Sequence, residues 1–190
     1  SIFVTKKTIG VYINGAKVIQ SDITVDNGII HKIDRALNPP VGTITQTIFV
    51  NGLDSLYKAI ARATNDTTGD AGLTNTLNTS TITMFAPTDS AFISLLTALS
   101  LTDINEIPVD TLVDILSYHM VPGLNFSSDL VEGSLTMLAG GTTTINLTNG
   151  IKNGPTITGT GNSGNASNII KLNIVSRNAI IHQVDRVLLP

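Results

Sequence analysis

A duplicated segment constrains the fold of this chain more than any other feature. The 13 residues from Asn27 to Pro39, NGIIHKIDRALNP, recur 151 residues later as NAIIHQVDRVLLP, from Asn178 to Pro190, and eight of the positions are identical. A repeat of this kind indicates two copies of one structural unit. Because the second copy ends a stretch long enough for a whole domain, we expect residues 43–190 to be a complete module. We expect residues 1–40 to be the C-terminal strands of a preceding, truncated module.

The pattern within residues 1–40 is that of β-strands joined by tight turns. Val11 and Ile13 alternate with Tyr12, and the Asn14-Gly15 pair that follows is a strong signal for a two-residue hairpin turn. The stretch 39–40 is Pro-Pro, which cannot continue a hydrogen-bonded strand. It therefore marks the boundary between the two parts of the chain.

Residues 43–190 mix helical and strand periodicity. Apolar residues recur at helical spacing over 53–63, and further helices are predicted after Thr88 or Asp89, which can cap a helix, and after Pro108. Strands are predicted at 43–50, 82–86, 169–174 and 179–184, with hairpin strands from residue 135 onward. The sequence therefore predicts an α+β fold.

A stretch rich in Gly, Ser and Asn, Thr156–Asn168, is predicted to be an exposed loop that folding does not require. If Asn14-Gly15 corresponds to Asn153-Gly154, the offset between the two copies is 139 before this stretch and 151 after it. The second copy is then 12 residues longer (151 − 139). Insertions of this kind belong on the surface of a domain.

Composition and charge exclude several classes of protein. Thr and Asn supply 43 of the 190 residues while charged residues make up only 13%, a balance that favours turns and strand surfaces. The net charge is −3 and Lys and Arg form no run, which argues against binding to nucleic acid. Without Cys the chain has no disulfide and no thiolate metal site, and no apolar run approaches the length of a membrane span.

Three segments in order resemble a fasciclin domain: TMFAPTDSAF at Thr83–Phe92, LSYHMVPG at Leu116–Gly123 and NAIIHQVDRVLLP at Asn178–Pro190. The first and last resemble the two signature segments of that family, and the middle one resembles its Tyr-His motif. The resemblance covers 43–190 as a whole domain and 1–40 as the end of another. It implies a β-wedge or sandwich with helices packed around it, in a secreted or surface-anchored protein that acts in adhesion.

The same resemblance assigns candidate residues. The candidate adhesive residues are Asp114, Ile115, Tyr118 and His119, because integrin recognition by animal relatives has been linked to the Tyr-His region and to Asp-Ile dipeptides. The structural signature is expected to comprise Thr83, Phe85, Ala86, Pro87, Thr88, Asp89, Phe92, His119, Asn178, Ile181, His182, Asp185 and Arg186. No catalytic, cofactor-binding or metal-ligating residue is predicted.

A structural interpretation stands beside the adhesive one. His119 falls on the apolar helical face that carries Leu112 and Leu116, which favours a buried, hydrogen-bonded histidine, and Asp114 is then a solvated residue. His31 and His182 occupy equivalent positions of the two copies and are expected to lie a domain apart, not to share a zinc ion.

The dipeptide Asp-Arg is also repeated, as Asp34-Arg35 and Asp185-Arg186. Neighbours in a strand point to opposite faces, so we expect no ion pair within either dipeptide. One member of each is expected to turn inward and bond backbone groups.

These patterns predict a non-catalytic adhesion or matrix-binding module, located outside the cell or on its surface. Its partner is an unknown surface protein or polysaccharide, and no cofactor is expected. The alternative is a structural assembly unit in which residues 1–40 mediate subunit association. Strands that end a module, left alone, expose an apolar face and a free edge.

Overall fold

The two copies of the repeat form the same β-hairpin. The computed structural model describes residues 2–37, 39–40, 42–65, 70–148, 150 and 154–190. Strand β3 (Ala16–Val25) pairs with β4 (Gly28–Ile33), and β10 (Ser167–Val175) pairs with β11 (Ala179–Val184), both antiparallel. Four of the five residue pairs of the first hairpin, such as Ile23 with Ile30, recur 151 residues later in the second, with irregularities at the same places.

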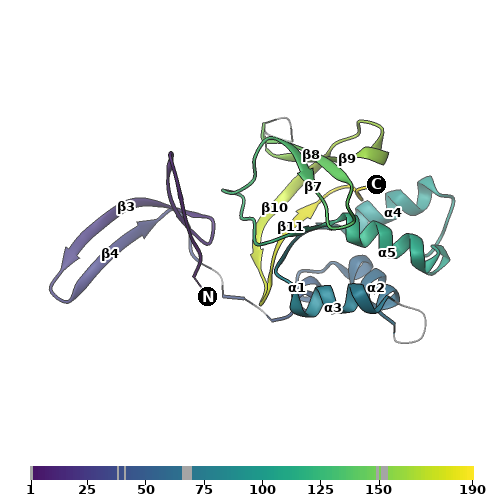
Figure 1. Cartoon of the computed structure of the whole chain (residues 1–190), viewed down its shortest axis with the longest axis horizontal. Helices are drawn as coiled ribbons and strands as arrows, with labels where there is room; N and C mark the ends of the chain where they lie inside the picture. Colours follow the sequence, from purple (N-terminus) through teal and green to yellow (C-terminus); the bar gives the residue numbers. More distant parts are fainter. Residues whose placement is uncertain (1, 38, 41, 66–69, 149, 151–153) are drawn as a thin grey trace.

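The first hairpin belongs to a small sheet of its own. Strands β1 (Val4–Lys7) and β2 (Gly10–Ile13) precede it, and the order is β1-β2-β3-β4. The predicted turn at Asn14-Gly15 is confirmed, since both residues have positive φ, 47° and 75°, as a type I′ turn requires. The β3–β4 hairpin projects away from the rest of the chain (Figure 1).

The second hairpin lies inside a sheet of seven strands. The others are β5 (Ile82–Pro87), β6 (Met120–Pro122), β7 (Gly133–Thr136), β8 (Thr142–Asn146) and β9 (Thr156–Gly159). Their order is β6-β5-β11-β10-β9-β8-β7, and only β5 and β11 run parallel. Every residue of β5 and of β11 is buried, so this parallel pair forms the centre of the domain.

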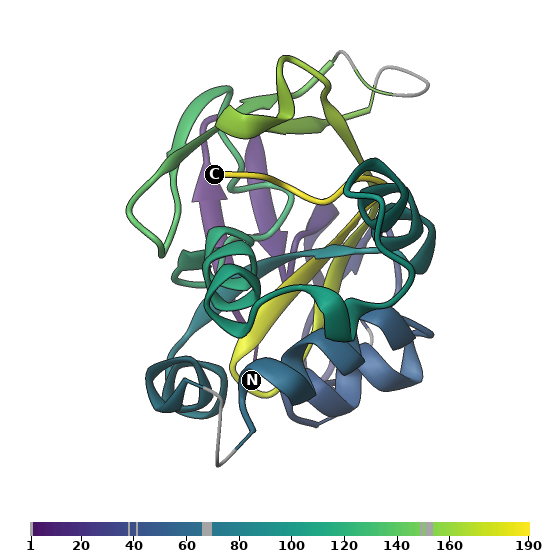
Figure 2. The same ribbon diagram turned by 90° about the vertical axis from the view of Figure 1, so that its right-hand side faces the viewer.

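In the described part of the chain five α-helices pack around the central pair, which confirms the predicted α+β fold (Figure 2). They are α1 (Ile44–Val50), α2 (Asp54–Ala63), α3 (Ala71–Thr79), α4 (Asp89–Ala98) and α5 (Val109–Tyr118), with a short 3-10 helix, η1, at Ile104–Glu106. Their apolar residues form one core with β5 and β11, while a second core lies between these strands and β7–β9. Thr88 caps α4 as predicted, its hydroxyl accepting from the Ala91 amide at 3.3 Å.

The prediction of a strand over residues 43–50 is wrong, because these residues form α1. Thr43 and Gln46 make a capping box, in which each side chain accepts a hydrogen bond from the other residue's backbone amide. Ile44 and Ile48 lie four residues apart and are both buried. The cap and this apolar spacing outweigh the strand propensity of Ile and Thr.

Helix α3 was not predicted from the sequence. Its buried apolar residues are only Leu73 and Leu77, and Thr and Asn occupy most of its other positions. Asp70 caps it by accepting from the Leu73 amide at 2.6 Å. Two apolar contacts and a cap suffice here because the helix rests on a core that other segments supply.

The prediction that Thr156–Asn168 is an exposed loop is also wrong, while its dispensability for folding stays a prediction. It contains β9 and a 3-10 helix, η3 (Thr160–Asn162), and Thr156, Ile157, Gly159, Asn162 and Ser167 are buried. Asn162 donates to the Val187 carbonyl at 2.9 Å and accepts from the Leu189 amide at 3.0 Å. The segment thereby holds the C-terminal end of the chain.

Strand register also corrects the alignment of the two copies. β2 pairs with β3 at Ile13 and Ala16, and β9 pairs with β10 at Ile157 and Ser167. The offset is therefore 144 before the turn and 151 after it, so the second copy is seven residues longer here (151 − 144). Asn153, on which the larger figure depended, lies outside the described residues.

We predict that Asn162→Ala lowers the free energy of unfolding by roughly 1–3 kcal/mol, because it leaves two buried backbone groups of the C-terminal segment without partners. Urea denaturation measures the change. The matched control is Asn105→Ala in η1, an exposed Asn, which should change stability by less than about 0.5 kcal/mol. Equal effects of the two variants would show that the 156–168 segment is not structural.

Candidate functional site

Three of the four candidate adhesive residues are buried. Ile115, Tyr118 and His119 are each at most 5% exposed at the end of α5, whereas Asp114 on the same helix is exposed. A partner could reach Asp114 directly but not the other three side chains. The expectation that His119 is buried is confirmed, and an adhesive role of this set stays a prediction.

His119 joins the end of α5 to the C-terminal segment. Its Nε2 accepts from the Leu188 amide at 2.8 Å, so its Nδ1 carries the proton and donates to the Ile115 carbonyl at 2.7 Å. Burial lowers the pKa of His119 from 6.5 to about 4. The ring is therefore neutral and held by two backbone groups.

Tyr118 joins the same helix to the far side of the sheet. Its hydroxyl donates to the Thr142 carbonyl and accepts from the Thr160 amide at 3.0 Å. Gly141 must stay small, since a Cβ there would lie 2.8 Å from the Tyr118 ring. The Tyr-His motif thus connects three segments that are distant in sequence.

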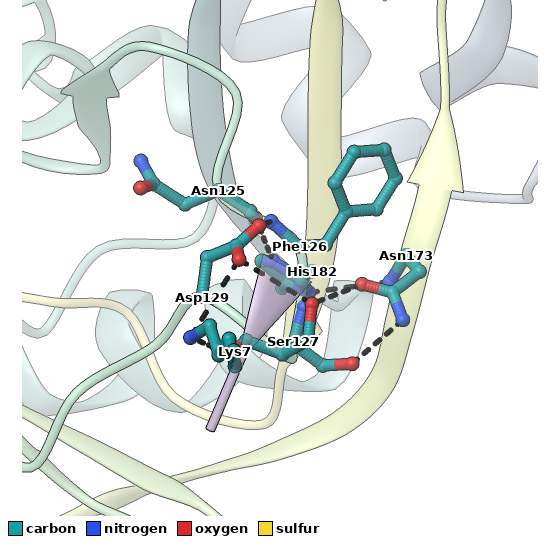
Figure 3. A network of polar contacts seen from close by, with 8 residues as sticks. Lys7, Asn125, Phe126, Ser127, Asp129, Asn173 and His182 are labelled. Carbon is teal, nitrogen blue, oxygen red and sulfur yellow. Dashed lines mark hydrogen bonds and ion pairs between the residues drawn. The ribbon is translucent and has the colours of Figure 1, made fainter. Parts of the chain in front are cut away.

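His182, on β11, anchors a second network that reaches the loop after β6 (Figure 3). Its Nδ1 accepts from the Asn173 amide at 3.3 Å, and its Nε2 donates to the Asn125 carbonyl at 3.0 Å. The His182 ring lies 5.6 Å from the ring of Phe85, centroid to centroid. Burial lowers the pKa of His182 from 6.5 to about 4, so this ring is neutral as well.

The loop Asn125–Asp129 is held from several sides. Thr83 on β5 accepts from the Asn125 amide at 2.8 Å, and Asn173 bonds both the amide and the hydroxyl of Ser127, at 2.7 Å each. Asp129 closes the loop by accepting from the Phe126 amide at 3.0 Å. These hydrogen bonds fix the loop Asn125–Asp129, which we call the ledge, at the edge of the domain.

The N-terminal sheet docks on this ledge. Lys7 on β1 donates to the Ser128 carbonyl and forms an ion pair with Asp129, with 3.6 Å between the charged atoms. Phe3 contacts Phe126, with ring centroids 6.1 Å apart. Gly15 approaches so closely that a Cβ would lie 2.8 Å from Asn173 Nδ2. Thr83 and His182, two residues of the predicted signature, thus hold the ledge on which the N-terminal sheet docks.

The first copy of the repeat keeps the internal hydrogen bonds of the second. The Asp22 amide donates to His31 Nδ1 at 3.2 Å, as the Asn173 amide does to His182. The Lys17 amide donates to Asp34 Oδ1 at 3.0 Å, as the Asn168 amide does to Asp185 at 2.7 Å. In each Asp-Arg pair the aspartate accepts from a backbone amide of the neighbouring strand, but only Asp185 is partly buried, whereas Asp34 is exposed.

The expectation of no ion pair within the dipeptide is wrong for Asp34-Arg35. Arg35 Nε lies 3.8 Å from Asp34 Oδ1, and the Arg35 guanidinium also donates to the Gly15 carbonyl. Both residues lie in a bend after β4, not in the strand. The alternation of strand side chains therefore does not apply to them.

An aromatic pair lies exposed on the helical side of the domain. Phe49 on α1 and Tyr57 on α2 are 60% and 41% exposed, with ring centroids 5.6 Å apart. Tyr57 also lines an open groove of about 650 Å³, whose polar lining includes Lys58, Arg62 and Asp103. Apolar rings next to mixed polar groups form a surface that can contact a protein or a sugar chain.

The described part of the chain offers no group of three or more His, Cys, Asp or Glu residues placed to hold a metal ion. Two of its three histidines, His119 and His182, are buried, and their ring nitrogens form hydrogen bonds with backbone groups. Among the helices that the structure describes, none has both the length and the apolar character of a membrane span.

Sequence reasoning missed the ledge at Asn125–Asp129 and its partner Asn173. Asn173 has a left-handed backbone, with φ of 60°, and its equivalent Asp22 has φ of 57°. Asn and Asp tolerate this conformation better than other residues with a Cβ, so an Asn/Asp pair at equivalent positions was the available signal. Which loop this side chain contacts is decided only by the fold.

Comparison with known proteins identifies relatives of the whole chain. The fasciclin domain family matches residues 1–39 and 53–190. The chain is similar to a fasciclin-like arabinogalactan protein of Arthroderma benhamiae, 28% identical over 93% of this chain and 37% of that protein. It is also similar to human periostin, 30% identical over 95% of this chain and 20% of that protein. The chain thus spans well under half the length of these two relatives.

A shorter match and a solved structure extend the comparison. Immunogenic protein MPB70 of Mycobacterium bovis is 32% identical over 62% of this chain and 54% of that protein. A domain pair from the insect cell adhesion molecule Fasciclin I has the same fold, with a TM-score of 0.62 and 19% identity. That match covers all of this chain and 67% of the pair.

We predict that stability falls as the pH drops from 7 to 4. Both buried histidines have a pKa of about 4 in the folded chain and of 6.5 when unfolded. Between pH 6.5 and pH 4 the unfolded chain binds more protons than the folded chain. Each histidine therefore lowers the free energy of unfolding by up to roughly 3 kcal/mol at pH 4, and below pH 4 its contribution no longer changes. Urea denaturation at pH 7, 5.5 and 4.5 measures this loss.

The variant His119→Gln should flatten the pH dependence, because it removes one of the two titrating groups. Asn105→Ala, at an exposed residue without a titrating group, is the control and should leave the slope as in the parent. A parent chain equally stable at pH 7 and 4.5 would contradict the assignment of two neutral, backbone-bonded rings.

Proposed function

The chain belongs to the fasciclin domain family, and on this basis we propose that it is an adhesion or matrix-binding module that acts outside the cell or on its surface. It acts by binding and not by catalysis. Its solved structural neighbour comes from a cell adhesion molecule, which supports this proposal. The partner is a surface protein or a polysaccharide.

The observation that carries the proposal is the exposed aromatic pair Phe49–Tyr57 beside the groove. An exposed apolar residue on its own is ordinary, but two aromatic rings in tilted contact on neighbouring helices give apolar area, and Lys58 and Arg62, which line the groove with Tyr57, give orienting polar groups. Of the four candidate adhesive residues only Asp114 is exposed to a partner, because Ile115, Tyr118 and His119 are buried. Adhesion is therefore assigned first to the aromatic pair.

The test is binding of the labelled chain to an array of matrix proteins and glycans. We predict that replacing Phe49 and Tyr57 together by Ser weakens binding to whichever ligand is found by at least about tenfold, since aromatic anchors dominate most interfaces. The matched control is Leu99→Ser at the end of α4, an exposed apolar residue that does not line the groove. Loss of binding in Asp114→Ala instead would assign adhesion to the Tyr-His region.

A second candidate function, assembly through residues 1–40, is favoured by the β3–β4 hairpin. We propose this part of the chain to be the C-terminal strands of a preceding fasciclin module. Ile29 and Ile30 on β4 are 61% and 51% exposed, and Val25 on β3 is exposed beside them. An apolar, exposed edge strand promotes association unless something covers it.

We predict that light scattering after size-exclusion chromatography detects self-association of the chain, and that Ile29→Lys shifts the population to monomer. A charge in the apolar face opposes contact between hairpins, which gives the expected direction. The matched control is Ile9→Lys, 71% exposed in the β1–β2 turn. A parent chain that is monomeric at all concentrations would exclude self-assembly through this hairpin.

A further inference from the structure

We propose that the open edge of β4 is a receptor for a strand of the β5 type, and that its partner is the front portion of a fasciclin module. In residues 43–190 this portion runs from α1 to β6. The inference builds on the second candidate function, because it names the chemistry of the partner. It does not require the chain to associate with itself.

The hairpin β3–β4 already has the conformation that such a strand meets. Four of its five residue pairs and its irregularities match those of β10–β11, and Asp22 has the left-handed φ of its equivalent Asn173. The backbone-to-side-chain bonds at His31 and Asp34 are also in place. The receptor is therefore preorganised, so binding need not pay the cost of ordering it.

The same hairpin in the complete module shows what is missing. β11 lies between β10 and β5, and its residues Ile180 and Ile181 are 0% and 1% exposed. Their equivalents Ile29 and Ile30 are 61% and 51% exposed, and β4 pairs only with β3 among the described strands. The difference arises because, among the described residues, the first copy has no strand equivalent to β5 and no helices equivalent to those that pack on β5 and β11.

Exposure alone does not identify this surface. Comparison of the two copies separates residues that are exposed in both from residues that are exposed only in the first. Ile19 on β3 is 53% exposed, but its equivalent Ile170 is 50% exposed in the complete module as well. Val25, Ile29 and Ile30 differ, as does Leu37 beyond the end of β4, since their equivalents Ser176, Ile180, Ile181 and Leu188 are buried. The uncovered residues therefore cluster at β4 and at the end of β3 beside it.

His31 identifies the partner more closely. His182 Nε2 donates to the Asn125 carbonyl, in the loop that follows β6. His31 keeps the Nδ1 bond of its equivalent, but its Nε2 has no hydrogen-bond partner among the described residues. A front portion that brought its own loop after β6 would supply the carbonyl, whereas a generic apolar surface would not.

A folded second copy does not fit this edge. Its β5 is already enclosed between β6 and β11, so it could bind β4 only by leaving its own sheet. The partner must therefore present a free strand. The preferred arrangement is parallel, as in the six pairs from Ala179 with Ile82 to Val184 with Pro87, which place Gly28–Ile33 opposite the incoming strand.

The test uses a peptide of residues Thr81–Ser90, TITMFAPTDS, from the chain's own β5 region. It is added to the intact chain, and in a second form it is joined ahead of residue 2 by a Gly/Ser linker, which raises its effective concentration to the millimolar range. Hydrogen exchange followed by mass spectrometry reports residues 28–33 and 179–184 separately. A scrambled peptide of the same composition, free and joined, is the control.

We expect the joined peptide to slow exchange in 28–33 by at least about tenfold at the amides that face the open edge, and to leave 179–184 unchanged. Ile30→Lys should abolish this protection, while Ile9→Lys should not. Retained exchange protection in β3 of the Ile30→Lys chain shows that the hairpin itself remains folded.

Unchanged exchange in 28–33 with both forms of the peptide would overturn the inference, as would equal protection by the scrambled sequence. Because exchange is read within one chain, a monomeric parent excludes self-assembly without affecting this result. Failure of the array experiment likewise leaves it untouched. Failure of the exchange experiment, of the self-association experiment and of the array experiment can therefore be told apart.

Discussion

The parallel pairing of β5 with β11 is the interaction on which the rest of this structure depends. The two strands lie almost a hundred residues apart in the sequence, and all their residues are buried. One side of the pair carries the helical core, and the other carries the core shared with β7–β9. Removing either strand would expose both cores at once.

Two neutral histidines hold elements to this central pair, and they do so with opposite tautomers. His119 donates through Nδ1 and accepts at Nε2, whereas His182 accepts at Nδ1 and donates through Nε2. In each ring one nitrogen accepts from a backbone amide, so protonation would replace a hydrogen bond by the opposition of two donors. His119 and His182 therefore each join two parts of the domain through backbone groups.

The N-terminal sheet shows what happens to the same sequence without its cover. Its hairpin reproduces most of the register of β10–β11, and the ledge at Asn125–Asp129 holds its base through Phe3 and Lys7. The far part of the hairpin has no contact that buries Ile29 and Ile30. Local pairing and turn chemistry thus suffice to shape the hairpin, but burial of its apolar face requires a partner segment.

Much of this fold could be predicted from the sequence because its signals are local. The repeat located the two equivalent hairpins, the Asn14-Gly15 turn followed from backbone preference, and the α+β class followed from periodicity. The predictions failed where local preference and tertiary contact disagree. Thr43–Val50 has strand propensity, yet its cap and the core against which it packs make it a helix. Helix α3 has too few apolar residues to be recognised without that core.

The sequence by itself determined the family, the duplicated hairpin and the burial of His119, since each depends on residue identity at fixed spacing. Only the tertiary structure decided that Thr156–Asn168 is not an exposed loop, because the role of Asn162 depends on the backbone of Val187 and Leu189, 25 and 27 residues away. It also decided which apolar residues of the repeat are covered. Ile29 and Ile180 are the same residue in the same strand position, and only the presence of β5 beside one of them makes it part of a core.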